Sequence, residues 1–177
     1  MSDQTLVCTT PRLLISRLTP HDAAFMLRLL NEPSFHQNIG DRGVRTLDDA
    51  RTFITNGPVA SYERHGFGLF RVDLKETQET IGICGLLKRD WLEDVDVGFA
   101  FLPQFWSKGH AFESSVGVIQ WARQALGITR VLGITKPDNH GSMRVLEKLG
   151  LRFARMVTSP EGQESRLFTP EERTEVF

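Results

Sequence analysis

The sequence predicts a mixed α+β fold in which a mainly antiparallel central sheet is flanked by helices. Three observations support this prediction. One strand followed by two helical stretches comes first along the chain, three alternating strands with short polar turns come next, and helix and strand then alternate. The length of 177 residues, with 40% hydrophobic and 24% charged residues, is typical of a globular domain. We therefore expect a single domain over residues 1–177, with its core at about 10–170.

The region before residue 60 predicts one strand and two helices. The strand covers residues 12–18 and ends at Thr19-Pro20, where the first helix begins. This helix carries an apolar stripe and stops at Asn31-Glu32-Pro33. Thr46 is the expected N-cap of the second helix because acidic residues follow it in the first turn. Asn56-Gly57-Pro58 is the expected end of that second helix.

The rest of the chain predicts a three-stranded meander and then alternating elements. The meander strands are expected over 66–72, 80–87 and 95–102, joined by polar turns. The elements after them are a helix over 111–126, a short buried strand over 130–135, a helix over 141–149 that Gly150 closes, and strands near 151–157 and 164–168.

Composition excludes several classes of function. The formal net charge of -1, with scattered basic residues, argues against a protein that binds nucleic acid through a broad basic face. Cys8 and Cys84 are the only cysteines and no histidine cluster joins them, so we expect no metal site and interpret Cys84 as a buried free thiol. No apolar run approaches the roughly 18 residues of a membrane span, and residues 1–4 do not begin a signal peptide. We expect a cytoplasmic protein.

The segment from Leu102 to Glu113 is the first candidate site. It joins a strand to a helix through small residues, so several backbone N–H groups converge where the helix dipole adds positive charge. Gly109 permits close approach of the backbone, and Lys108 adds a charge. The segment therefore indicates phosphate binding, and the alternative is a plain strand-to-helix turn. It matches neither the P-loop nor the dinucleotide-binding pattern.

A second candidate site begins at Pro137-Asp138-Asn139, a turn that starts a helix. Asn139 and Ser142 both belong to this helix start. Either side chain is suited to cap the free helix amides or to bind a ligand.

In this order and spacing, the two sites resemble the GNAT acyltransferase superfamily, and within it the N-terminal acetyltransferases of ribosomal proteins and their small relatives. Residues 106–111 align with the pattern [QR]-x-x-G-x-[GA], with Trp106 in place of the first polar residue. The other matching segments are Asp96-Val97-Gly98-Phe99 for the signature Glu-Ile-Gly-Tyr, Pro137-Asp138-Asn139 with Ser142 and residues 147–151 for the second motif, and Thr10-Pro11-Arg12-Leu13 for the usual opening. The resemblance covers roughly residues 10–170.

The resemblance implies a site for acetyl-CoA in a V-shaped split between the fourth and fifth predicted strands, 95–102 and 130–135. Loop amides from Ser107 to Ala111 would hold the pyrophosphate, and the backbone of residues 99–101 would pair with the pantetheine arm. Asn139 would bond that arm, and Ser142 would lie near the thioester sulfur. The implied cofactor-binding set is Phe99, Ala100, Phe101, Trp106, Ser107, Lys108, Gly109, His110, Ala111, Asn139 and Ser142, with His110 expected to contribute its backbone amide.

The implied reaction is direct attack of an unprotonated amine on the acetyl thioester. Asp96 is the candidate base, with a substrate-positioning role as its alternative, and Asp94 is a weaker candidate. Many relatives protonate the thiolate with a tyrosine, but Leu146 occupies that position and Tyr62, the single tyrosine, is distant in sequence. Ser142 is therefore the candidate proton donor, with helix capping as its alternative.

The expected function is N-acetyl transfer from acetyl-CoA to a primary amine, by a monomer or homodimer that needs no metal and binds neither nucleic acid nor membrane. The acceptor is a protein or peptide N-terminus, or a small amine such as a polyamine or an aminoglycoside-like compound. The first two helices and their joining segment, residues 31–45, are expected to recognise the acceptor. This segment holds Glu32, Asp41, Arg42 and Arg45, a mixed set of charges that favours neither kind of acceptor. A non-catalytic acyl-CoA-binding module and transfer of a longer acyl group, such as succinyl, are the alternatives.

Overall fold

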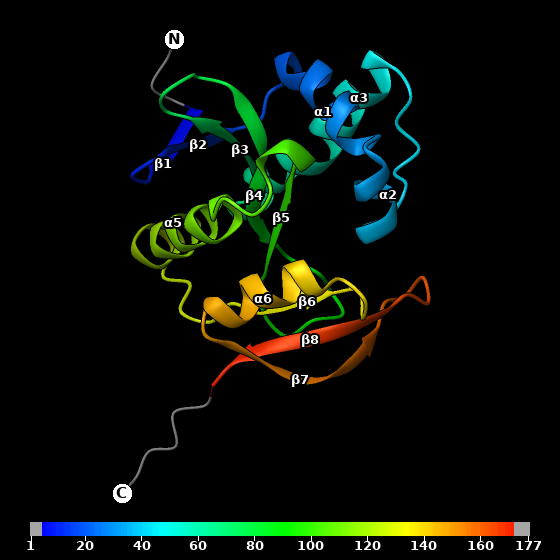
Figure 1. Cartoon of the computed structure of the whole chain (residues 1–177), viewed down its shortest axis with the longest axis vertical. Coiled ribbons are helices and arrows are strands. Elements are labelled where there is room, and N and C mark those ends of the chain that lie inside the picture. Colours follow the sequence, from blue (N-terminus) through cyan, green and yellow to red (C-terminus); the bar gives the residue numbers. More distant parts are fainter. Residues whose placement is uncertain (1–4, 172–177) are drawn as a thin grey trace, which may run out of the picture.

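The computed structural model describes residues 5–171 as two antiparallel sheets with helices packed against them (Figure 1). The first sheet has the order β1-β2-β3-β4-β5, with β1 at Leu6–Thr9, β2 at Leu13–Arg17, β3 at Leu69–Leu74, β4 at Thr80–Leu87 and β5 at Asp96–Phe101. The second has the order β6-β8-β7, with β6 at Gly133–Thr135, β7 at Leu151–Thr158 and β8 at Glu164–Pro170. The predicted α+β class, with its antiparallel meander, is confirmed.

Most helices fall in two places along the chain. Four α-helices of the described residues precede β3: α1 at Ala23–Leu30, α2 at Pro33–Asn38, α3 at Leu47–Ile54 and α4 at Ala60–His65. The other two are α5 at His110–Leu126 and α6 at His140–Lys148. In Figure 1, α1, α2 and α3 gather at one end of the first sheet, and α6 lies over the second sheet. Within residues 5–171, no helix combines the length and apolar character that a bilayer crossing requires.

The split between the predicted fourth and fifth strands is confirmed at β5 and β6. The two sheets touch through one parallel bridge between Asp96 and Leu132. The Val97 amide donates to the Leu132 carbonyl at 2.9 Å, and the Leu132 amide donates to the Val95 carbonyl at 2.8 Å. Beyond this bridge β6 pairs with β8 instead, so the remaining length of β5 has an open edge on that side.

Two apolar clusters hold the helices against the first sheet. Helix α5 packs through Val118 and Ala122 into a cluster with Phe70 and Leu86 of the sheet. The same cluster contains Cys84, which is a buried free thiol as predicted, and burial raises its pKa to about 11. The helices before β3 form the second cluster, whose fully buried members include Met26, Leu29, Leu30, Ile54 and Leu102. The first cluster also contains Leu146 of α6 and Phe168 of β8, so one apolar core joins the two sheets on either side of the split.

The helical region before β3 differs from the prediction. The predicted end of the second helix at Asn56-Gly57-Pro58 is wrong, because the chain continues through a π-helical turn, Thr55–Val59, into α4. A proline inside an α-helix clashes with the carbonyl four residues earlier, and the wider π turn accommodates Pro58. The helix ends instead at Gly66, with φ of 79°.

Two short elements were missed, and one strand is shorter than predicted. Strand β1 forms a hairpin with β2, although its four residues carry no clear alternation. Helix α2 begins at Pro33, which was interpreted only as a helix stop but occupies the first helical position, where proline is tolerated. The predicted strand over 130–135 is reduced to β6, because the residues before it turn towards the bridge with β5.

Candidate functional site

Two open cavities meet in the split. One, here called the carboxylate cavity, has a volume of about 650 Å³ and is lined by Asp96. The other, here called the loop cavity, has a volume of about 720 Å³ and is lined by the segment between β5 and α5. Both are lined by Phe99 and Ala100 of β5 and by Asn139 and Ser142 at the start of α6. The two sequence-predicted sites are therefore brought together at the junction of the cavities.

The loop between β5 and α5 has the backbone geometry of an anion site. Ser107 has φ of 59° and Gly109 has φ of 82°, so the chain reverses sharply before α5 begins. Within residues 5–171, no acceptor takes a hydrogen bond from any amide between Ser107 and Phe112. Consecutive free amides at the start of a 17-residue helix form a concave donor set that suits phosphate.

Arg12 holds this loop in place, which sequence reasoning missed. Its Nη1 donates to the Lys108 carbonyl at 2.9 Å, and its Nε donates to Glu113 at 2.6 Å. The Thr10 hydroxyl donates to the same carboxylate at 2.6 Å. Burial alone would raise the pKa of Glu113, but the hydrogen bonds from Thr10 and Arg12 outweigh it and keep that pKa below its ordinary value. The motif Thr10-Pro11-Arg12-Leu13, which lies at the turn between β1 and β2, therefore supports the loop before α5.

Two aromatic side chains of the loop, Trp106 and His110, differ in exposure and in hydrogen bonding. The Trp106 indole is 46% exposed, and its Nε1 donates to the Phe101 carbonyl at 2.8 Å, which ties the loop to the end of β5. The His110 ring is only 6% exposed, and its buried Nδ1 has no hydrogen-bond partner within residues 5–171. Burial, reinforced by the charge of Arg12, lowers the pKa of His110. His110 is also among the residues that line the loop cavity.

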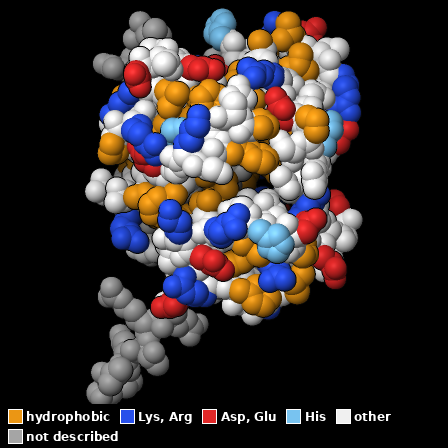
Figure 2. Space-filling model, viewed as in Figure 1, with side chains coloured by type: hydrophobic (Ala, Val, Ile, Leu, Met, Phe, Trp, Pro, Cys, Tyr) orange, Lys and Arg blue, Asp and Glu red, His pale blue; other side chains and the backbone are white. Residues whose placement is uncertain are grey.

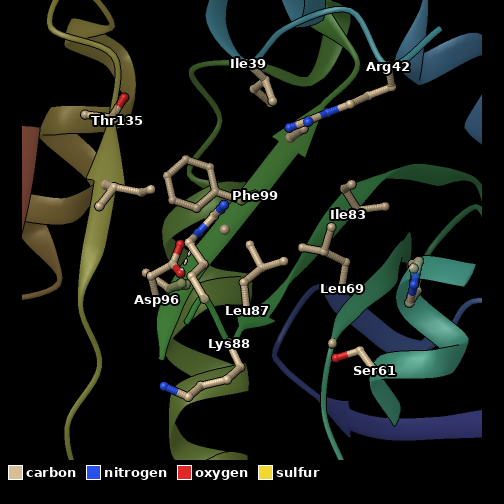
Figure 3. Close-up of a pocket in the computed structure, with 18 of the residues that line it drawn as sticks. Ile39, Arg42, Ser61, Leu69, Ile83, Leu87, Lys88, Asp96, Phe99 and Thr135 are labelled. Carbon is tan, nitrogen blue, oxygen red and sulfur yellow. Dashed lines mark hydrogen bonds and ion pairs between the residues drawn. The ribbon is translucent and has the colours of Figure 1, made fainter. Parts of the chain in front are cut away.

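Asp96 is the buried carboxylate of the site. It is 1% exposed, and one of its oxygens accepts a hydrogen bond from Arg89 Nε at 2.9 Å (Figure 3). Burial raises the pKa of Asp96 to about 6, against the opposing attraction of Arg89. Asp94, the weaker candidate base, pairs with Arg130 at 2.6 Å and is not among the residues that line the cavity. The geometry therefore favours Asp96 over Asp94.

The start of α6 separates the roles of Asn139 and Ser142. Asn139 is the N-cap, because its Oδ1 accepts a hydrogen bond from the Ser142 amide at 3.2 Å. The Ser142 hydroxyl makes no hydrogen bond to another residue of the described chain and lines both cavities. Asn139 is therefore the residue that caps α6, and the Ser142 hydroxyl is free to form a hydrogen bond with a ligand at the junction of the two cavities.

Among residues 5–171, no tyrosine lines either cavity. Leu146 is fully buried, and a Cβ on Gly133 would lie 2.6 Å from its side chain, so it fills the space between α6 and β6. Tyr62 lies elsewhere, accepting a hydrogen bond from the Leu18 amide at 3.1 Å and donating to the Leu69 carbonyl. Burial raises the pKa of Tyr62, which is consistent with a structural phenol.

The predicted acceptor segment reaches the carboxylate cavity only in part. Arg42 lines it, whereas Asp41 and Arg45 form an ion pair with each other instead. The chain between α3 and α4 also lines the cavity, which was not anticipated because a turn was expected there. Lining residues that sequence reasoning missed include Arg64, Arg89, Lys88 and Lys136. Their scattered positions in the sequence gave no signal of a common site.

The described residues offer no grouping of three His, Cys, Asp or Glu side chains with the arrangement of a metal site. On the face shown in Figure 2, Lys and Arg side chains are interspersed with acidic and apolar ones. The polar groups that the cavities bring together are the Asp96 carboxylate, the Ser142 hydroxyl and the free loop amides.

Comparisons with known proteins agree on one kind of protein. A family model described as an acetyltransferase (GNAT) domain matches residues 12–152. The uncharacterised N-acetyltransferase YoaA of Bacillus subtilis is 26% identical over 148 residues, which are 82% of each chain. An acetyltransferase structure from Agrobacterium tumefaciens has a TM-score of 0.78 at 22% identity, covering 96% of this chain and 95% of that one. The ribosomal L7/L12 α-N-protein acetyltransferase RimL, solved with coenzyme A, has a TM-score of 0.77 at 13% identity, with coverages of 93% and 96%.

Proposed function

The chain belongs to the GNAT acetyltransferase family, and from this premise we propose that it transfers the acetyl group of acetyl-CoA to a primary amine by direct attack. One observation carries the proposal. A cavity lined by free helix-start amides meets a cavity that contains a buried carboxylate, and Phe99 and Ser142 stand at the junction. A thioester donor would enter from the first cavity and an amine from the second. RimL, whose fold is similar, was solved with coenzyme A, which supports this donor.

The loop cavity is proposed to hold the coenzyme. The free amides of residues 107–111 and the Lys108 charge suit the pyrophosphate. The edge of β5 is open beyond the bridge to Leu132, so the backbone of residues 99–101 is suited to pair with the amide groups of the pantetheine arm. Asn139 uses its Oδ1 as the cap and keeps its Nδ2 for the same arm. Trp106 contributes as a wall of the cavity.

The carboxylate cavity is proposed to hold the amine. With a pKa of about 6, Asp96 is mainly ionised at pH 7 and is basic enough to take a proton from the ammonium, directly or through water. The freed nitrogen attacks the thioester carbonyl, so a C–N bond forms and the C–S bond breaks. The attacking nitrogen gives up its second proton to solvent as the amide forms, and the departing thiolate takes a proton from the Ser142 hydroxyl, which solvent restores. A β5 amide near Phe99 would polarise the carbonyl oxygen.

A thiol-release assay tests the proposal. The protein is incubated with acetyl-CoA and a panel of peptides and small amines, and free coenzyme A and acetylated product are both measured. We expect stoichiometric product and thiol with at least one class of amine. Tight binding of acetyl-CoA by calorimetry without thiol release for any amine would contradict the proposal in favour of a non-catalytic acyl-CoA-binding module. Preference for succinyl-CoA over acetyl-CoA would contradict the acetyl assignment alone.

A further inference from the structure

The carboxylate cavity has an uneven distribution of charge. Its acidic lining residues are Asp96 and Glu161. Its cationic lining residues are Arg42, Arg64, Lys88, Arg89 and Lys136. This excess of cations contrasts with the whole chain, whose formal net charge is -1. Positive charge is therefore concentrated where the amine of an acceptor would enter.

Three of the five cations have partners. Arg89 forms an ion pair with Asp96 at 2.9 Å. Lys136 Nζ donates to the Gln37 carbonyl at 2.9 Å, and Lys88 Nζ approaches the Leu92 carbonyl at 3.5 Å. These contacts fix the three side chains but, except for Arg89, do not neutralise their charge. They leave the cavity positive.

Arg42 and Arg64 have no ion pair and no hydrogen bond with any residue between 5 and 171. Figure 3 shows the guanidinium end of Arg42 extending from the segment between α2 and α3 into the space before β5, near Phe99. Glu161 lies close enough for the charges of Arg89 and Arg42 to lower its pKa, although its hydrogen bond with Ser159 has the largest effect. An unpaired planar guanidinium that lines a cavity suits two-point binding of a carboxylate or a phosphate.

The carboxylate cavity also has an apolar wall. Its lining side chains include Ile39, Leu69, Ile83, Leu87 and Phe99 (Figure 3). An acceptor that fills this space therefore needs an apolar body, with polar groups at its two ends. Asp96 lies at one end of this wall, and the free guanidinium of Arg42 lies at the other.

We propose that the acceptor is a small amine with an apolar body and an anionic group, and that Arg42 binds the anionic group while the amine meets Asp96. The inference rests on the proposed acetyl transfer and narrows its acceptor. A carboxylate and a phosphate offer Arg42 the same chemistry. Polyamines and aminoglycoside-like polycations are disfavoured, because the surplus positive charge of the cavity repels their additional ammonium groups.

Pairs of acceptors that differ only in the anionic group isolate the contribution of that group to the reaction rate. Each pair joins an anionic amine with its neutral counterpart: an apolar amino acid with its carboxamide, 6-aminohexanoate with 6-aminohexanamide, and an aminoalkyl phosphate with its alcohol. Spermidine represents the polycations. Values of kcat/KM are expressed per unprotonated amine, so that differences in amine basicity do not enter. We expect the anionic member of at least one pair to exceed its neutral partner about tenfold or more, with spermidine below both.

Two variants test the role of Arg42. Arg42→Gln should bring the ratio of anionic to neutral acceptor close to one, mainly through KM. Arg51→Gln is the matched control, because Arg51 is an exposed arginine of α3 that pairs with Asp48 and does not line either cavity. The control should preserve the ratio. An unchanged ratio in Arg42→Gln would overturn the inference.

Other outcomes also test the inference, and they distinguish its failure from a failure of the proposed acetyl transfer. Equal use of neutral and anionic members, a preference for spermidine, or acetylation of peptides with acidic N-termini while small acids are refused would overturn the inference and leave acetyl transfer intact. If no amine of the panel is acetylated, calorimetric titration of the same pairs into the coenzyme A complex measures their affinities. Equal affinities for the anionic and neutral members would then overturn the inference. Failure to bind acetyl-CoA at all would instead contradict the proposed function.

Discussion

At the scale of single residues, Asp96 combines two opposing demands. Burial raises its pKa to about 6, and the neighbouring Arg89 limits the rise. The carboxylate is thereby basic enough to accept a proton and still ionised at neutral pH. Arg89 does not need to touch an acceptor to matter, because it lowers the proton affinity of the proposed base.

Arg89→Gln should therefore move the pH profile of the reaction. Without the positive charge, burial acts unopposed and the pKa of Asp96 rises further. We expect the acid limb of kcat/KM, taken per unprotonated amine, to move from about pH 6 to higher pH by roughly one unit. Arg89→Lys should restore most of the difference. A uniform loss of rate with an unmoved acid limb would show that Arg89 has only a structural role.

Asp96 also makes a testable contribution to stability. Because its folded-state pKa of about 6 exceeds the ordinary value of 3.8, the folded protein holds this proton more firmly than the unfolded chain does. The resulting stability is fully present below pH 3.8 and is lost as the pH rises through about 6. Between pH 4 and pH 7, the unfolding free energy of the wild type should fall relative to Asp96→Asn by an amount on the order of 3 kcal/mol. Urea unfolding of both proteins at several pH values measures this, and a constant difference would contradict it.

At the scale of elements, the loop before α5 depends on one glycine. Gly109 has φ of 82°, and a Cβ there would lie 3.3 Å from Arg12 Nη2, so a larger residue would strain the backbone and press on the side chain that holds the loop. We expect Gly109→Val to weaken acetyl-CoA binding by tenfold or more. Calorimetric titration measures the affinity, and circular dichroism verifies that the fold persists.

Gly127 supplies the matched control for this glycine. It closes the other end of α5 with φ of 68°, and nothing lies within 4 Å of a Cβ built there. Gly127→Val should therefore strain the same helix by a similar amount without touching the loop cavity. Equal loss of affinity in both variants would mean that helix stability, and not the loop, governs binding.

The elements also show what sequence can predict. The segments around Gly109 and Asn139 were recognisable because their residues are contiguous and each has a local physical meaning, a helix start or a cap. The meander was recognisable by its alternation. The loop-supporting role of Arg12 was not, because its partners Lys108 and Glu113 lie about 100 residues further along the chain. Arg89 lies only seven residues from Asp96, but its own segment gave no sign that the two side chains would pair. The stop signal at Asn56-Gly57-Pro58 was misleading because a π-helical turn accommodates Pro58 and the helical path continues into α4.

At the scale of the whole molecule, the split is a place where backbone hydrogen bonding has been left incomplete. The two sheets share a bridge at Asp96 and Leu132, and β5 then runs on with an open edge. Unpaired edges are normally a liability that proteins cover. Here helix α6 and the loop before α5 flank the edge and leave two cavities, so a ligand with amide groups could complete the missing strand.

Ligand binding should consequently stabilise the whole fold and protect one region of it. At a concentration of coenzyme A about 100 times its Kd, linkage predicts roughly 2.7 kcal/mol of added stability. For a chain of this size that corresponds to a rise in Tm of roughly 5–10 °C. Hydrogen exchange should slow at residues 97–101 and at the amides of residues 107–112, which have no acceptor in the free protein, and should change little in the β1–β2 hairpin. Protection spread evenly over both sheets would instead mean that coenzyme A acts through global stability and does not fill the split.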